Sequence, residues 1–135
     1  MKKLLLLSLI LSCILLCACG NNENTDTAKG EKLMYKQISP EEAKKIMDTE
    51  EDIVILDVRE QDEYDSGHIP GAVLLPYTEI EEKAEKMFPD KKQQILVYCR
   101  SGRRSKIASE SLAKLGYTNI KEFGGIIDWP YEVVK

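Results

Sequence analysis

A single cysteine closely followed by three arginines is the feature of this chain with the clearest chemical potential. Cys99 ends an apolar run over 95–98, and Arg100, Arg103 and Arg104 come directly after it. A cysteine between a strand end and a helix start meets unpaired backbone N–H groups and the positive end of the helix dipole. These groups and the guanidinium charges favour the thiolate. We therefore expect Cys99 to be a nucleophile in a site that binds an anion, rather than a structural core residue.

The residues around Cys99 predict a strand, a tight loop and a helix. Residues 95–98 are apolar and rich in β-formers, which is typical of a buried strand in a parallel sheet. Ser101 and Gly102 allow a tight turn, and Gly116 is placed to end the helix that begins near Arg104. Helical spacing gives this helix an apolar face made of Ile107, Ala108, Leu112 and Leu115.

Strand and helix patterns alternate along the rest of the chain. The pair Ser39 and Pro40 predicts the start of a short helix, and the apolar run over 53–57 predicts a buried parallel strand. A helix is also expected over 78–88, and a last strand over 119–123. Gly124 and Gly125, which follow, could bring backbone close to the Cys99 loop. This alternation predicts one α/β domain with a mostly parallel central sheet and helices on both faces.

The first part of the chain has the pattern of a bacterial lipoprotein signal. A basic start is followed by an apolar run over 4–16, too short to span a bilayer as a helix. Leu16-Cys17-Ala18-Cys19 matches the site at which a cysteine is lipidated, with the small Ala18 before it. We expect a signal peptide over 1–18, a flexible tether over 19–32 and a folded domain over 33–135. Cys19 would then anchor an extracytoplasmic protein to the bacterial cell membrane, the alternative being an ordinary secreted protein.

Cysteine content and charge narrow the range of functions. Of the four cysteines, Cys13 and Cys17 would leave with the signal peptide and Cys19 would carry lipid. Cys99 would be the only thiol of the folded domain, so we expect no disulfide, no metal site and no cofactor. The net charge of −4 includes Lys2 and Lys3; without the signal peptide, 17 basic and 23 acidic residues give −6, which argues against a nucleic acid partner. The local basic cluster at Cys99 indicates a small anion instead.

Four segments resemble the signatures of the rhodanese-like domain, the single-domain sulfurtransferase family, in that family's order. They are Asp57-Val58-Arg59-Glu60 with Glu63-Tyr64, Gly67-His68-Ile69-Pro70-Gly71-Ala72, the loop from Cys99 to Ser105, and Phe123-Gly124-Gly125 with Trp129. The resemblance covers about residues 33–129. It implies a rhodanese-like fold with Cys99 as the catalytic residue. It also implies a substrate-binding loop made of Arg100, Ser101, Gly102, Arg103, Arg104 and Ser105.

The same resemblance implies supporting roles for Asp57, Arg59 and His68. His68 is the only histidine of the chain and the obvious candidate for a general base. A thiolate that a helix terminus already stabilises needs no base, however. We therefore expect His68 to serve packing and hydrogen bonding.

The activity that the resemblance implies is sulfur transfer. Cys99 would take a sulfane sulfur from thiosulfate or a similar anionic donor as a persulfide, and pass it to a thiol or to cyanide. Two alternatives stay open. One is a persulfide carrier or binding module at the membrane surface. The other is a cysteine phosphatase or arsenate reductase, whose loop has five residues between cysteine and arginine, whereas four separate Cys99 from Arg104.

Overall fold

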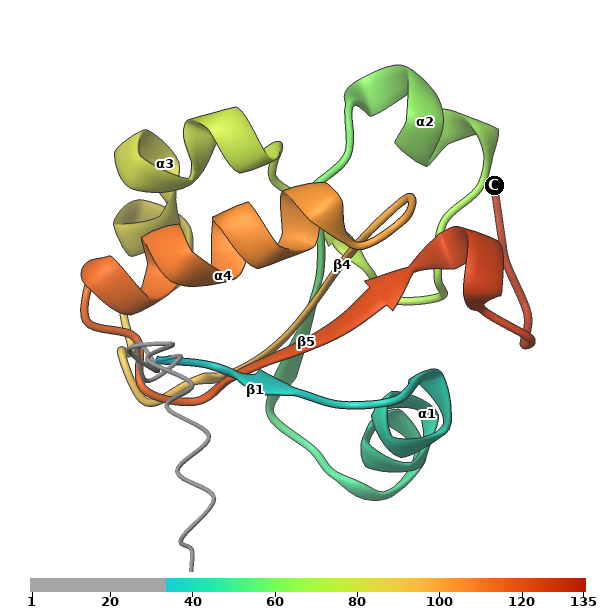
Figure 1. Cartoon of the computed structure of the whole chain (residues 1–135), viewed down its shortest axis with the longest axis horizontal. Coiled ribbons are helices and arrows are strands. Elements are labelled where there is room, and N and C mark those ends of the chain that lie inside the picture. Colours follow the sequence, from blue (N-terminus) through green and yellow to red (C-terminus); the bar gives the residue numbers. More distant parts are fainter. Residues whose placement is uncertain (1–33) are drawn as a thin grey trace, which may run out of the picture. The chain divides into compact units, whose positions relative to one another are not determined.

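A parallel sheet of five strands forms the centre of the computed structural model, which describes residues 34–135 (Figure 1). The strand order is β1-β5-β4-β2-β3, and every pair of neighbouring strands is parallel. The strands are β1 (Lys36–Gln37), β2 (Ile53–Asp57), β3 (Val73–Leu74), β4 (Gln94–Cys99) and β5 (Ile120–Gly125). The expected signal peptide, tether and lipidated Cys19 lie outside the described residues.

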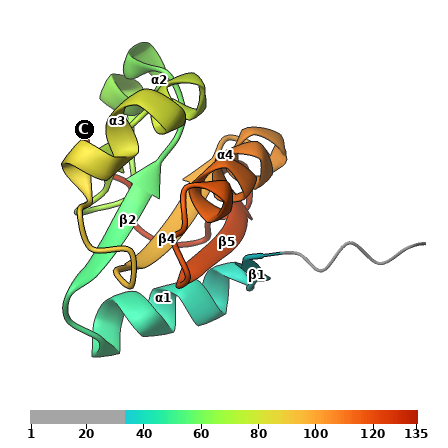
Figure 2. The ribbon, with the colours of Figure 1, turned by 90° about the vertical axis from the view of Figure 1, so that its left-hand side faces the viewer.

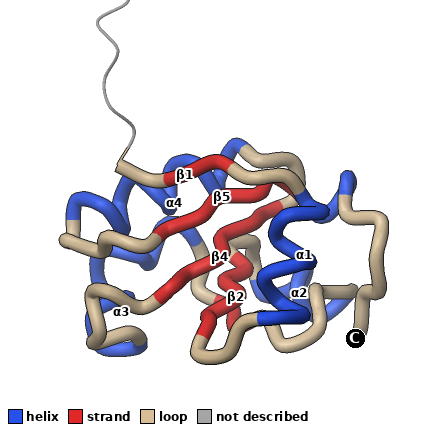
Figure 3. The backbone as a smooth tube through the Cα atoms, turned by 90° about the horizontal axis from the view of Figure 1, so that it is seen from below, coloured by secondary structure: helices blue, strands red, loops and turns tan. Residues whose placement is uncertain are grey.

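Helices cover both faces of the sheet, so the predicted fold class is confirmed. The helices are α1 (Pro40–Thr49), α2 (Gln61–Ser66), α3 (Ile80–Met87) and α4 (Arg103–Lys114), with short 3-10 turns η1 (Tyr77–Glu79) and η2 (Ile126–Asp128). Figures 2 and 3 show α1 on one face, and α3 and α4 on the other. Within residues 34–135, every helix is too short or too polar to cross a membrane.

Alternation along β4 decides which face each side chain reaches. Ile95, Val97 and Cys99 pack in the cluster that includes Ala108 and Leu112 of α4. Leu96 and Tyr98 pack in the opposite cluster, which includes Ala43 and Ile46 of α1. Cys99 therefore points toward α4, at the carboxyl end of a central strand, as the sequence predicts.

The local signals for helix ends agree with the structure. The Ser39 hydroxyl accepts a hydrogen bond from the Glu42 N–H at 3.1 Å, and Pro40 is the first residue of α1. Gly116 follows α4 with a φ of +94°, in the left-handed region that the sequence predicts.

The apolar face predicted for α4 is wrong at one position. Ile107 is 39% exposed, whereas Ala108 and Leu112 are fully buried. The face that is buried is rotated relative to the predicted one, because it also includes the small side chains of Ser105, Ser109 and Ala113. Ile107 lies one position away from that face, at its solvent side.

Candidate active site

Cys99 is almost completely buried beneath the loop that connects β4 to α4. Its exposed fraction is 1%, and the Gly102 N–H donates a hydrogen bond to its Sγ at 3.0 Å. Gly102 is the N-cap residue of α4 and has a φ of +97°, a conformation that glycine adopts at little cost. Because of this turn, a backbone donor at the start of α4 points at the sulfur. The expected strand–loop–helix arrangement around the thiol is present.

The environment of Cys99 shifts the equilibrium toward the thiolate. Burial alone raises the pKa of the Cys99 thiol. The Ser105 hydroxyl and the backbone N–H groups of Ser105, Gly102 and Ser101 act in the opposite direction and outweigh it. The pKa of Cys99 consequently lies below its ordinary value, as a nucleophilic cysteine requires.

The three arginines near Cys99 do not have equivalent positions. Arg104 donates two hydrogen bonds to Glu63 of α2, from Nη1 to Oε2 at 2.6 Å and from Nη2 to Oε1 at 2.8 Å. Bonding to Arg104 lowers the pKa of Glu63 to about 2. Arg100 and Arg103 are exposed, and among residues 34–135 neither forms an ion pair. Arg104 therefore braces α4 against α2, whereas Arg100 and Arg103 present their charge to solvent.

Strand β5 supports the loop from the other side. A Cβ atom built on Gly125 would lie 2.1 Å from the Arg100 carbonyl oxygen and 2.5 Å from the Ser101 Cα. The N–H of Ile127 donates to the same Arg100 oxygen at 3.2 Å. The close approach predicted for this pair of glycines is confirmed at Gly125.

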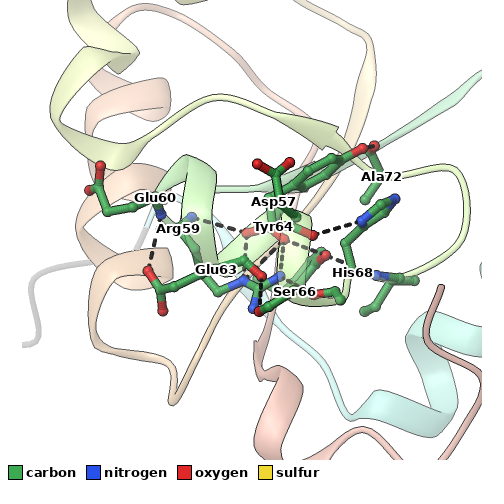
Figure 4. A network of polar contacts seen from close by, with 12 residues as sticks. Asp57, Arg59, Glu60, Glu63, Tyr64, Ser66, His68 and Ala72 are labelled. Atoms are coloured by element: carbon green, nitrogen blue, oxygen red, sulfur yellow. Dashed lines mark hydrogen bonds and ion pairs between the residues drawn. The ribbon is translucent and has the colours of Figure 1, made fainter. Parts of the chain in front are cut away.

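Asp57 and Arg59 form a buried ion pair on the opposite face of the sheet from Cys99. Arg59 Nη2 lies 2.6 Å from Asp57 Oδ2 and also donates to the Gly67 carbonyl at 2.7 Å. The Tyr98 hydroxyl donates to Asp57 Oδ2 at 2.6 Å. Figure 4 shows Asp57 and Arg59 in a larger set of polar residues that includes Glu63, Tyr64 and His68. The contacts of this ion pair fix the end of β2 and the loop that follows α2, and none of them is made to Cys99.

His68 is engaged in structural contacts away from the thiol. Its ring stacks on Tyr64 with a centroid distance of 3.7 Å, and Nδ1 lies 2.9 Å from the Tyr64 carbonyl oxygen. The backbone of His68 exchanges hydrogen bonds of 2.8 and 2.9 Å with Val134. These contacts tie the C-terminal segment to the loop after α2, and none of them is made to Cys99.

One residue of the site has no place among the sequence predictions. Glu122 of β5 is only 2% exposed, and its carboxylate accepts a hydrogen bond of 2.6 Å from the hydroxyl of Ser105. Ser105 Oγ is in turn 3.6 Å from Cys99 Sγ. The alternation of side chains along β5 could have indicated this position, because it places Glu122 on the same face of the strand as the buried Ile120.

Comparison with known proteins agrees with this geometry. The sequence profile of the Rhodanese-like domain family matches residues 39–130. The thiosulfate sulfurtransferase GlpE of Coxiella burnetii is 39% identical over 98 residues, which are 72% of this chain and 89% of GlpE. The Bacillus subtilis protein YrkF, named as a candidate sulfur carrier, is 39% identical over 94 residues, which are 69% of this chain but only 50% of YrkF.

A solved structure titled "rhodanese with anions from E. coli" has a similar fold. Its TM-score is 0.57 at 36% identity, and the match covers 61% of this chain and 96% of that chain. The profile match includes strands β2 to β5, the four helices and the Cys99 loop. The chain therefore belongs to the family of rhodanese-like domains.

Proposed function

We propose that this protein transfers a sulfane sulfur from thiosulfate or a similar anionic donor to a thiophilic acceptor, through a persulfide on Cys99. The observation that carries the proposal is the Cys99 sulfur itself, which ends a central parallel strand and accepts a hydrogen bond from the Gly102 N–H at 3.0 Å. The names of two similar proteins support it, namely the Coxiella thiosulfate sulfurtransferase and the E. coli rhodanese solved with anions.

The reaction divides into two displacements at sulfur. The Cys99 thiolate attacks the outer sulfur of thiosulfate, the sulfur–sulfur bond of the donor breaks, and sulfite leaves with the electron pair. An acceptor thiolate or cyanide then attacks the outer persulfide sulfur and regenerates the Cys99 thiolate. The backbone N–H groups that lower the pKa of Cys99 would stabilise the anionic sulfur at both stages.

Mass spectrometry of the purified chain after exposure to thiosulfate tests the proposal directly. A gain of one sulfur atom on the peptide that contains Cys99, removed again by cyanide, is the expected result. Initial rates at varied thiosulfate and cyanide should follow ping-pong kinetics. A chain that shows neither the added sulfur nor turnover would contradict the proposal.

A second candidate function is a persulfide carrier that delivers sulfur to one dedicated partner. The match to YrkF favours it, because that protein is named as a candidate sulfur carrier. A carrier would gain the sulfur atom on Cys99 but would turn over slowly with free thiosulfate and cyanide. Steady-state turnover with these two small molecules therefore separates the two functions.

Arg103→Ala is expected to weaken binding of the anionic donor. Arg103 is exposed at the start of α4, whereas Arg104 is held by Glu63. Loss of one charge-assisted contact should raise the KM for thiosulfate by roughly 5- to 100-fold, or about 1–3 kcal/mol, with a smaller change in kcat. High salt should reproduce part of this loss in the wild-type protein, because exposed charge is screened.

The matched control for this experiment is Lys114→Ala. Lys114 is an exposed cation in the last turn of the same helix, far along α4 from the loop. Its removal should leave the KM unchanged. If Arg103→Ala behaved like this control, the backbone N–H groups alone would make the anion site.

We further propose that Cys19 anchors the protein to the outer surface of the bacterial cell membrane. The pattern Leu16-Cys17-Ala18-Cys19 after an apolar run supports this proposal. Cys19→Ala should release the protein from the membrane fraction into the soluble fraction. The control variant Cys99→Ala should stay in the membrane fraction. An unaltered distribution of the Cys19→Ala variant would refute the anchor.

A further inference from the structure

The side chain of Glu122 is a buried carboxyl that only the Ser105 hydroxyl separates from the Cys99 sulfur. Its Oε1 accepts hydrogen bonds from Ser105 Oγ at 2.6 Å and from the Gly124 N–H at 2.8 Å, and its Oε2 accepts one from Gln37 Nε2 at 3.3 Å. Within residues 34–135, the carboxyl takes part in no ion pair. Neutral donors alone compensate its burial. A buried acid so near a nucleophile calls for a functional explanation.

The pairing of β4 with β5 shifts by one residue directly after Glu122. Val97 pairs with Glu122 and Cys99 pairs with Gly125, so two steps along β4 correspond to three steps along β5. The additional residue turns the Gly124 N–H toward the Glu122 carboxylate. Ser105 of α4 contacts both side chains, at 2.6 Å from Glu122 Oε1 and 3.6 Å from Cys99 Sγ.

The Ser105 hydroxyl can satisfy only one of its two ionisable neighbours at a time, because it has a single proton. When Glu122 is charged, the short bond to Oε1 takes that proton, and Ser105 Oγ accepts the S–H of Cys99. This direction of the chain limits the help that Ser105 gives the thiolate, while the loop N–H groups keep the pKa of Cys99 below its ordinary value. A neutral side chain at position 122 would leave the Ser105 hydroxyl free to donate to the thiolate.

Electrostatic repulsion between the Glu122 carboxylate and the Cys99 thiolate also disfavours the thiolate. A second negative charge in a buried site disfavours the thiolate, whereas Arg104 and the loop N–H groups favour it. Other charged or titratable groups surround the pair from the neighbouring elements. They are Tyr35 beside β1, Glu63 on α2, Arg100 in the loop, Arg103, Lys106 and Glu110 on α4, Asp128 on η2, and, on the far face of the sheet, Asp57 and Arg59 of the β2 end.

We propose that Glu122 is a positioning residue that controls, through the Ser105 hydroxyl, whether Cys99 is a thiol or a thiolate. The carboxylate engages the Ser105 hydroxyl through the 2.6 Å bond and so limits what that hydroxyl can donate to the Cys99 sulfur, 3.6 Å away. Glu122 also lines a hollow of about 340 Å³ with Gln37, Lys106 and Asp128.

The role of this control depends on the proposed function, in which Cys99 is the nucleophile. The Glu122 carboxylate opposes part of the stabilisation that the loop gives the thiolate, and a smaller share of thiolate makes Cys99 less open to oxidation. Glu122 thereby sets the balance between protection and reactivity at Cys99.

The test measures alkylation of Cys99 by iodoacetamide as a function of pH, in the full chain in detergent. The tryptic peptide over 93–100 reports on Cys99 alone, since it contains no other cysteine. Glu122→Gln keeps the side-chain shape but removes the charge. It should lower the midpoint of the alkylation profile by roughly one pH unit, which is about tenfold faster alkylation below the midpoint. An unchanged or raised midpoint would overturn the proposal.

A matched control and a second background sharpen the result. Glu110→Gln removes an exposed carboxylate from α4 and should leave the midpoint unchanged. In a Ser105→Ala background, the shift caused by Glu122→Gln should shrink by more than half, because the hydroxyl that links the two groups is absent. A shift of equal size in both backgrounds would show that Glu122 acts without Ser105 and would overturn the proposal as stated.

A reciprocal measurement keeps the proposal falsifiable if Glu122→Gln does not fold. The ¹³C carboxyl signal of Glu122 in the otherwise unaltered chain should show an inflection at the pH where Cys99 ionises. That inflection should vanish in Cys99→Ser, and its absence from the wild-type protein would contradict the coupling. Neither measurement uses a sulfur donor or acceptor, so failure of sulfur transfer and failure of this proposal are distinguishable.

Discussion

Cys99→Ser is expected to abolish sulfur transfer while leaving the fold intact. A serine hydroxyl is about the size of the thiol and can accept the Gly102 N–H bond that now reaches Sγ at 3.0 Å. It cannot form a persulfide, because the hydroxyl is not ionised near neutral pH and is a poor nucleophile toward sulfur. We expect kcat/KM for thiosulfate and cyanide to fall by roughly 10⁴-fold or more, to the level of the uncatalysed reaction.

Two measurements distinguish loss of the nucleophile from loss of the folded structure. Thermal unfolding of the variant should match that of the wild-type protein within a few degrees, since the buried volume and hydrogen bond are nearly preserved. Mass spectrometry after thiosulfate exposure should show no added sulfur anywhere on the variant chain. Residual turnover above about one percent of the wild-type value would mean that another group can accept the sulfur, and the assignment of Cys99 would fail.

Gly125→Ala is the second substitution with a large expected effect. The backbone of Gly125 is extended, with a φ of −128°, so alanine meets no conformational penalty of its own there. Its Cβ would lie 2.1 Å from the Arg100 carbonyl oxygen, however. The oxygen is a backbone atom and the Cβ is bonded directly to backbone, so no side-chain rotation can relieve the clash. The loop must move by about 1 Å, which displaces the donors around Cys99. We expect a fall in kcat/KM of about 100-fold or more, with a loss of stability of about 1–3 kcal/mol.

Gly116→Ala separates the loop displacement from the general cost of adding a methyl group. Gly116 has a φ of +94°, but no atom lies within 4 Å of a Cβ built there. Its replacement should therefore cost about 1–2 kcal/mol of stability through backbone strain and leave kcat/KM almost unchanged. Urea unfolding and sulfur-transfer kinetics of both variants provide the comparison. Gly125→Ala with wild-type kinetics would show that the loop tolerates displacement.

The fold was largely predictable because its signals are local. The run over 53–57 is continuous, apolar and ends in a carboxylate, and it is strand β2 in the structure. Ser39 and Pro40 start α1 by a capping interaction that involves only neighbouring residues. The position of Cys99 follows from the same kind of signal, a buried strand followed by a turn and an amphipathic helix.

The division of roles among the arginines and the acid near Cys99 was not predictable from local pattern. Arg104 is taken up by Glu63, which is 41 positions away in the sequence, and Ser105 meets Glu122 across 17 positions. Such pairs depend on how α2, α4 and β5 come together in three dimensions. Side-chain spacing along β5 places Glu122 on the same face as Ile120, but it does not identify Ser105 as its partner.

The lengths of the strands also affect how readily the sheet could add a strand from another molecule. Strands β1 and β3 form the two edges of the sheet and are two residues long, whereas the central strands β2, β4 and β5 have five or six. An edge this short offers few unpaired N–H and C=O groups to a second sheet. Strand-to-strand addition between neighbouring copies is therefore disfavoured over residues 34–135, which would help to keep the molecules separate at high local concentration.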